Sequence, residues 1–177
     1  KINAVVQKDV NDKYILELAR YFKGTGHIVR FIEYMDVGTL NKWKLDEVVS
    51  AKDIIGIIDQ ELPLEQIGSN YDGEVALRYR YKDGGGEIGI VSSVTEPFCG
   101  SCTRMRLSAD GHLYTCLFAE NGHDLKTPMR AGASDDELAV LISSIWGHRV
   151  DKYSEERAAL PSANGPANNV EMYHIGG

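Results

Sequence analysis

The sequence lacks a fourth cysteine, a long apolar run and an excess of positive charge. Its three cysteines in 177 residues are an odd number in a chain without export signals, so a disulfide framework is disfavoured and metal or redox chemistry is favoured. No stretch approaches the roughly 20 apolar residues of a membrane helix, and no secretory segment opens the chain. These absences predict no membrane partner and a cytoplasmic location.

The charge and composition of the chain bear on its partners and on the number of its domains. A net charge of −7 argues against a nucleic-acid partner, because polyanion binding depends on a basic face. With 43% hydrophobic and 25% charged residues, the chain is long enough for one folded domain or one and a half. Lys1 rather than Met stands first, and Lys1–Val6 already has strand character, so we expect a fragment that begins inside a structure.

The first elements are typical of an α/β unit. An apolar strand at Lys1–Val6 is followed by a helix that begins after Asn11 and ends at Gly24, and then by a β-rich run at His27–Glu33. This order predicts a parallel strand–helix–strand unit.

The elements after residue 44 change character. Ser50 begins a second helix, whose apolar stripe consists of Ala51, Ile54, Ile55, Ile58 and Leu62. Pro63–Gly73 is expected to be a connecting loop. Two strands at Glu74–Tyr81 and Glu87–Ser93 flank a glycine-rich turn, which predicts a hairpin.

The capping box formed by Ser134 and Glu137 begins a third helix that ends at Gly147. The predicted fold class is therefore α/β followed by α+β. We expect the change near residue 65, which divides the chain into residues 1–64 and 65–177.

The strongest chemical signal is the spacing C-x2-C-x13-C formed by Cys99, Cys102 and Cys116. Two thiolates two residues apart can hold one metal ion or two corners of a cluster, and a third closes the site. The spacing does not name the metal. A structural zinc site with His112 or His123 as the fourth ligand is the alternative to an iron–sulfur cluster.

A hairpin between the second and third cysteines sets the geometry. The segment Ser108–His112 fits a three-residue bulged loop with Gly111 in the left-handed conformation, which pairs Ser108 with His112. The residues then expected on one face are Cys102, Arg104, Arg106 and Cys116. A tight two-residue loop would instead pair Met105 with Cys116 and turn that cysteine away.

Arg104 and Arg106 lie beside these thiolates in the sequence. Guanidinium groups suit phosphate and carboxylate oxygens, so the pair predicts an anionic ligand next to a metal centre. Neutralisation of thiolate charge, or pairing with surface carboxylates, is the alternative.

Motifs along nearly the whole chain resemble the C-terminal portion of the MoaA family of radical-SAM GTP 3′,8-cyclases, which act in molybdenum cofactor biosynthesis. The matching segments are residues 30–38, residues 98–111 (FCGSCTRMRLSADG), residues 116–118, residues 151–157 (DKYSEER) and residues 173–177. The resemblance implies the last strands of an incomplete (βα)6 barrel in residues 1–64 and a cluster-binding extension in residues 65–177.

The resemblance also implies a reaction with two clusters. One [4Fe-4S] cluster, in an N-terminal half, cleaves S-adenosylmethionine to a radical, and a second leaves one iron open to the guanine of GTP. Hydrogen abstraction at C3′ and attack on C8 would give 3′,8-cyclo-7,8-dihydro-GTP, for use by the cyclic pyranopterin monophosphate synthase. By matching positions, Cys99, Cys102 and Cys116 would hold the second cluster.

Other positions carry over in the same way. Arg104, Met105 and Arg106 should contact GTP, Lys1 should face the nucleotide, and Met35 should lie against S-adenosylmethionine. Met35 comes just past a predicted strand, where barrel ligands bind.

Arg30 lies within that predicted strand, where a charge needs an anionic partner, so it is a further candidate for contact with the triphosphate of GTP or with the cofactor. An internal salt bridge is the alternative. Gly176-Gly177 resembles the family's tail that reaches the active site, although composition alone is typical of a frayed end.

One departure is important: the radical-generating C-x3-C-x2-C motif is absent, so this chain alone cannot make the radical. A half barrel would also expose a sheet edge and apolar surface, which predicts either poor stability as a monomer or a homodimer paired through that edge. A radical-SAM enzyme that modifies peptides is a further alternative, but such extensions usually carry more cysteines.

Overall fold

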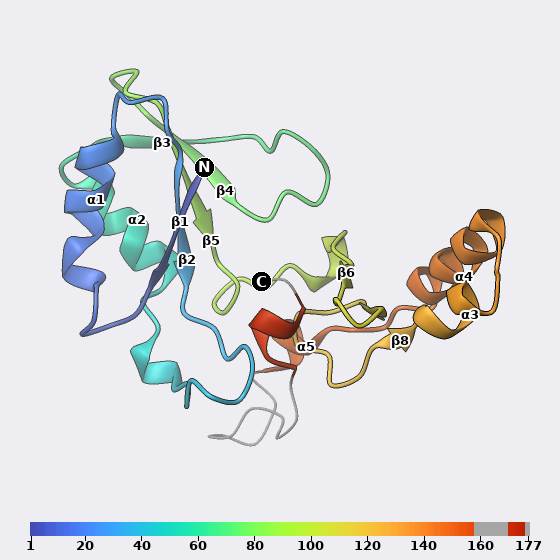
Figure 1. The fold of residues 1–177 in the computed structure, drawn as a ribbon. Helices are drawn as coiled ribbons and strands as arrows, with labels where there is room; N and C mark the ends of the chain where they lie inside the picture. Colours follow the sequence, from blue (N-terminus) through green and yellow to red (C-terminus); the bar gives the residue numbers. More distant parts are fainter. Residues whose placement is uncertain (158–169, 176–177) are drawn as a thin grey trace. The chain divides into compact units, whose positions relative to one another are not determined.

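The computed structural model describes residues 1–157 and 170–175. The chain divides into two compact units (Figure 1): Lys1–Met35 with Lys44–Cys102, and Asp36–Trp43 with Thr103–Gly177. The mixed α/β class predicted from the sequence is confirmed. The barrel and the division after residue 64 stay predictions.

The first unit contains one five-stranded sheet in the order β1-β2-β5-β4-β3. Its strands are β1 (Ile2–Val6), β2 (Val29–Glu33), β3 (Leu64–Ile67), β4 (Leu77–Tyr81) and β5 (Glu87–Val91). β1, β2 and β5 are parallel, whereas β4 is antiparallel to both β5 and β3. The predicted parallel strand–helix–strand unit and the predicted hairpin are both confirmed.

The prediction of a loop over Pro63–Gly73 is wrong in its first part, because Leu64–Ile67 form β3. Leu64 pairs with Tyr81 and is buried, whereas Glu65 pairs with Arg80 at the exposed face. An edge strand with two polar residues in its centre has little apolar signal in the sequence, and its pairing with β4 decides its conformation.

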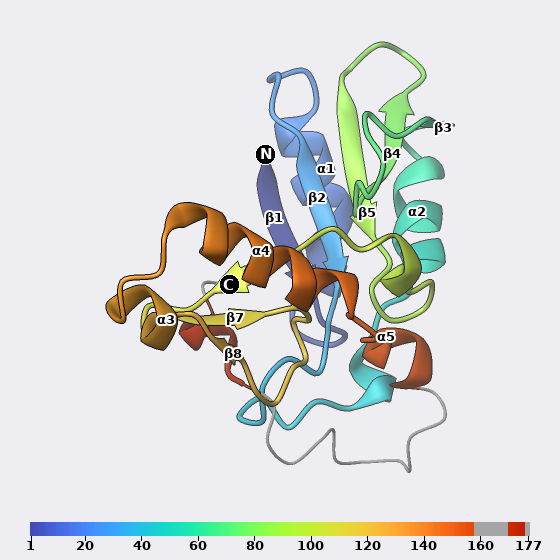
Figure 2. The same ribbon diagram turned by 90° about the vertical axis from the view of Figure 1, so that its right-hand side faces the viewer.

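Helices α1 (Ile15–Phe22) and α2 (Ala51–Asp59) lie on the same face of this sheet (Figures 1 and 2). They bury the core between themselves and the strands, and its members include Val6, Ile15, Ala19, Phe31, Ile54, Ile58, Ile88 and Ile90. The predicted start of α2 is confirmed, since the Ser50 side chain accepts a hydrogen bond from the Asp53 amide at 3.1 Å.

The second unit contains a small antiparallel sheet and short helices. Its elements are β6 (Arg106–Leu107), β7 (His112–Tyr114), β8 (His123–Asp124), α3 (Lys126–Arg130), α4 (Asp135–Gly147) and α5 (Tyr153–Glu156). The capping box of Ser134 and Glu137 is confirmed at the start of α4. Among the described residues, no helix combines the length and apolar character that crossing a membrane requires.

We expect the core face of α2 to dominate the stability of the first unit. Ile54 is 0% exposed and Ile57 is 38% exposed on the same helix. Ile54→Ala should lower the free energy of unfolding by about 2–5 kcal/mol because it leaves a cavity. Ile57→Ala should lower it by less than about 1 kcal/mol. Urea denaturation of both variants checks this, and equal losses would contradict the assignment of the buried face.

Candidate functional site

The first two cysteines form a tight turn in the first unit. Cys99–Ser101 adopt a 3-10 helix, and the Cys102 amide donates to the Cys99 carbonyl oxygen at 3.2 Å. Cys99 is buried and Cys102 is half-buried. A turn of this kind brings the backbones of the two cysteines close together, as two ligands of one centre require.

Cys116 belongs to the second unit and follows β7. The Phe118 amide donates to its sulfur at 3.4 Å, and none of the three cysteines forms a disulfide. An N–H donor stabilises a thiolate, and such bonds tune iron–sulfur clusters. Among residues 1–157 and 170–175, no three His, Cys, Asp or Glu side chains are grouped as a metal site. The soft thiol donors nevertheless fit a cluster by their chemistry.

The hairpin between the cysteines has the bulged loop that the sequence predicts. Ser108 and His112 are paired, with the Ser108 amide donating to the His112 carbonyl oxygen at 2.9 Å, and Gly111 has φ of 86°. Arg106 pairs with Tyr114 in the same register. The regular ladder ends there, so the predicted pairing of Arg104 with Cys116 lies beyond it and stays a prediction. Arg104 and Arg106 are both half-buried.

A row of residues crosses the sheet on the face opposite the helices. Asn3, Arg30, Gly89 and Arg78 are neighbours on β1, β2, β5 and β4. Arg30 is half-buried, and its Nε donates to Asn3 Oδ1 at 2.8 Å. A Cβ at Gly89 would lie 2.9 Å from Arg30 Cγ, so glycine there leaves space for the arginine stem. Among the described residues Arg30 forms no ion pair, so the internal salt bridge is not observed.

A hollow on this face brings Arg30 together with Lys1. Its charged lining residues are Lys1, Arg30, Glu74, Arg78 and Glu87. Arg78 is already engaged, since it donates to Glu87 and to the Gly68 carbonyl oxygen at 2.8 Å each. Lys1 and Arg30 therefore supply the positive charge available to an anion. Met35 lies two residues past the end of β2, as the sequence predicts.

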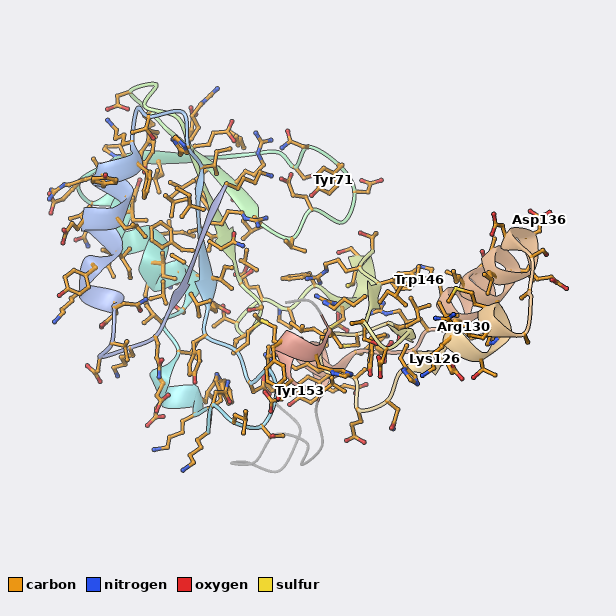
Figure 3. The ribbon with its side chains drawn as sticks, viewed as in Figure 1. Tyr71, Lys126, Arg130, Asp136, Trp146 and Tyr153 are labelled. Carbon is orange, nitrogen blue, oxygen red and sulfur yellow. The ribbon has the colours of Figure 1, made fainter. Side chains whose placement is uncertain are left out.

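Sequence reasoning assigned no role to Asp36, although it organises the second unit. Asp36 is 4% exposed. Its carboxylate accepts a hydrogen bond from Tyr153 Oη at 2.5 Å and forms an ion pair with Arg157 Nη2 at 2.6 Å. Tyr153, labelled in Figure 3, stacks on Phe118 with 4.6 Å between ring centroids. Phe118 is also the residue whose amide contacts Cys116, so this cluster fixes the backbone around the third cysteine.

The electrostatics of the cluster follow from its burial. The pKa of Tyr153 is raised above its usual value, first by burial and then by the hydrogen bond to Asp36 and the charge of that carboxylate. Arg157 lies over the rings of Phe118, Tyr153 and Trp43 at 5.1, 5.5 and 5.8 Å. The signal missed in the sequence was the spacing of Tyr153 and Arg157, four residues apart in a short helical turn.

A second contact holds the segment that follows Met35. The Glu171 carboxylate accepts hydrogen bonds from the Thr39 amide at 2.7 Å and the Thr39 hydroxyl at 3.0 Å, and these bonds lower the pKa of Glu171. Gly38 has φ of 71°, and a Cβ there would lie 2.1 Å from a Glu171 oxygen. The predicted active-site tail, Gly176-Gly177, lies outside the described residues.

The histidines considered as zinc ligands lie in the second unit. His112 Nδ1 is 3.2 Å from Asp110 Oδ2, and His174 Nε2 is 3.8 Å from the same oxygen. His123 is exposed on β8. The carboxylate of Asp110 thus lies between two imidazoles, and its pKa is lowered chiefly by the Ser108 hydroxyl.

Comparison with known proteins identifies the class. The family described as Molybdenum Cofactor Synthesis C matches residues 27–155, and the chain belongs to this family.

The relatives make the resemblance more specific. The chain is 51% identical over 177 residues to a GTP 3′,8-cyclase of Xanthomonas axonopodis pv. citri (strain 306), covering 100% of this chain and 52% of that protein. It is 45% identical over 199 residues to a GTP 3′,8-cyclase of Acidothermus cellulolyticus, covering 100% and 55%. The Staphylococcus carnosus GTP 3′,8-cyclase is 45% identical over 178 residues, with 100% and 52% covered. The chain spans about half the length of these curated relatives, and the predicted resemblance to their C-terminal half is confirmed.

The Asp36 cluster makes the stability of the chain depend on pH. Tyr153→Phe should lower the free energy of unfolding at pH 7 by about 1–3 kcal/mol, because a buried carboxylate loses a donor. The folded-state pKa of Tyr153 lies above its ordinary value of 10.0, so the tyrosine contributes fully below pH 10 and its contribution falls as the pH rises further. Urea denaturation at pH 7, 10 and 11 should show that the free energies of unfolding of the wild type and of Tyr153→Phe approach each other as the pH rises.

Two features of the chain control this measurement. Burial raises the pKa of Tyr81 to about 12, but this effect is common to both proteins and cancels in the difference. Tyr71→Phe, at a tyrosine that is 58% exposed and labelled in Figure 3, should change little at any of these pH values. A gap between wild type and Tyr153→Phe that stays constant to pH 11 would contradict the assignment.

Proposed function

We propose that this chain forms the C-terminal half of a GTP 3′,8-cyclase, a radical-SAM enzyme that converts GTP to 3′,8-cyclo-7,8-dihydro-GTP in molybdenum cofactor biosynthesis. The observation that carries the proposal is the match of all 177 residues, at 51% identity, to a protein of that name. The thiol set and the cationic positions are consistent with the same reaction.

In this proposal Cys99, Cys102 and Cys116 hold a [4Fe-4S] cluster. When bound, it offers one iron without a protein ligand to the substrate. The chain's contribution is to hold three thiolates in place. The tight turn fixes the first two, and the Phe118 amide stabilises negative charge on Cys116.

The cations of the chain would hold and orient GTP. Arg104 and Arg106 flank Met105 at the start of the hairpin, where guanidinium groups can contact nucleotide oxygens. Lys1 and Arg30 share a hollow on the sheet face and suit a triphosphate. Met35, at the end of β2, would contact S-adenosylmethionine.

The remaining parts of the reaction would come from outside this chain. The cysteines that generate the radical would lie in the half of the relatives that the chain does not match. The product would pass to a cyclic pyranopterin monophosphate synthase. A cytoplasmic location and a homodimer belong to the same proposal.

The metal content tests this proposal against the zinc-binding alternative. After anaerobic reconstitution of the chain with iron, sulfide, and zinc in competition, we expect about four irons, a brown colour and a broad visible band that GTP perturbs. Cys116→Ser should reduce the iron content, whereas Ser143→Ala, at an exposed serine of α4 in the same unit as Cys116, should leave it unchanged. One zinc per chain with no visible band would reject the cluster and favour a structural site with a histidine ligand.

The arginines at the hairpin are expected to act on GTP and not on the metal. Arg104→Ala and Arg106→Ala should each weaken GTP binding by roughly tenfold or more, because a charge-assisted contact contributes about 1.5–3 kcal/mol. Their iron content should stay at the wild-type level. Calorimetric titration with GTP and iron analysis of the same samples provide the two readings.

Arg130→Ala is the matched control for these variants. Arg130 is an exposed arginine at the end of α3 in the same unit, labelled in Figure 3. Its removal changes the net charge of the chain equally. If all three variants weaken GTP binding to the same extent, the effect is one of overall charge and the specific contacts are rejected.

A further inference from the structure

Glu33 is a buried carboxylate at the end of β2, and its side chain faces inward from the strand. It is 0% exposed. Oε1 accepts a hydrogen bond from the Ala51 amide at 2.7 Å and another from the Thr95 hydroxyl. Oε2 accepts hydrogen bonds from the amides of Val94 and Thr95 at 2.7 and 2.8 Å. All four donors are N–H or O–H groups of the first unit.

These donors belong to two different segments. Ala51 is the first residue of α2, whereas Val94 and Thr95 lie in the loop that connects β5 to the Cys99–Cys102 turn. The loop closes on itself through the Glu96 amide, which donates to the Ser92 carbonyl oxygen at 3.1 Å. Three of the four hydrogen bonds to Glu33 therefore come from the loop that leads to the cysteines.

Loss of the hydrogen bonds to the buried Glu33 carboxylate would cost much free energy. A carboxylate removed from water costs several kcal/mol unless donors replace its hydration. Two consecutive amides aimed at one oxygen form the kind of anion-binding concavity that fixes backbone conformation. A carboxylate held in this way constrains the loop as strongly as the loop stabilises the carboxylate.

The constraint reaches the cysteines over a short length of chain. Only residues 96–98 separate Thr95 from Cys99, and Pro97 restricts the backbone among them. The turn itself is tied internally, by the Cys102 amide to the Cys99 carbonyl and by the Ser101 hydroxyl to the Phe98 carbonyl at 3.5 Å. A shift at Thr95 would therefore move the turn as a unit.

We propose that Glu33 is a positioning residue for the Cys99–Cys102 turn, which it fixes to the end of β2, just before Met35. The inference rests on the proposed function in one respect, that these cysteines are cluster ligands. The carboxylate places the two thiols for metal binding without contacting the metal. Because Met35 follows Glu33 by two residues, the same anchor fixes the backbone expected to meet S-adenosylmethionine.

Thr95→Val tests the hydrogen bonds between Glu33 and the loop separately from the bond between Glu33 and α2. It removes one donor to Glu33 and leaves the bond to α2 intact, and Thr95 is otherwise exposed, so the fold should tolerate the change. Thr95→Ser restores the hydroxyl and is the conservative rescue. Ile54→Val, in the core of the same unit, lowers stability without touching the loop.

The test measures thiol reactivity in the metal-free chain, which does not depend on the identity of the metal. Iodoacetamide labelling is followed by mass spectrometry for Cys99, with Cys116 in the second unit as the internal reference. We expect Thr95→Val to label at Cys99 roughly tenfold faster than wild type, because loss of one charge-assisted hydrogen bond opens the loop locally. Thr95→Ser and Ile54→Val should label at the wild-type rate, and Cys116 should be unchanged throughout.

Release of iron to a chelator gives a second reading on the reconstituted protein, and Thr95→Val should release it faster while Thr95→Ser does not. Wild-type labelling of Cys99 in Thr95→Val would overturn the proposal. Equal acceleration by Ile54→Val would also overturn it, because the turn would then open only by general unfolding. A wild-type chain that binds zinc and no iron would reject the proposed function, while the labelling result would still decide the role of Glu33.

Discussion

Glu33 in the first unit and Asp36 in the second are carboxylates that the fold removes from water, and each joins segments of its unit that are distant in the sequence. Glu33 accepts only N–H and O–H donors from α2 and the loop before Cys99. Asp36 instead accepts a hydrogen bond from the Tyr153 hydroxyl and forms an ion pair with Arg157, whose guanidinium lies over three aromatic rings. The burial of both charges is stable only while all of their donors are present. The backbone near Cys99 and the backbone near Cys116 are thus each held by a charge that cannot return to water without disrupting its unit.

The sequence allowed the order of the elements in the first unit to be predicted, because local signals agreed with the final packing there. Ser50 caps α2 as expected, and the stripe that includes Ile54 and Ile58 forms the core. β3 was missed because its central residues are polar and only its pairing with β4 makes it a strand. The hairpin register was predictable from Gly111, since few residues accept its backbone conformation.

The candidate site was predictable to a different degree. Cysteine spacing and the motif around Arg104 identify their own segments, because metal ligands must have particular side chains. The supporting contacts have no such signature. Glu33 has partners about 60 residues away in the sequence, and Asp36 has a partner more than 115 residues away. No local sequence pattern distinguishes these donors from other hydrogen-bond donors of the chain. Long-range polar contacts of this kind follow from the fold and not from local composition.

The chain passes from the first unit to the second and back before it enters the second unit again. This order limits how the second unit can be exchanged between related proteins. Residues 36–43 belong to the second unit although they lie between β2 and α2 in the sequence. A chimera joined at residue 103 alone would combine one parent's Asp36 and Gly38 with the other parent's Arg157 and Glu171. Recombination between relatives should therefore carry both segments together, and the narrow space above Gly38 makes that glycine part of the inherited set.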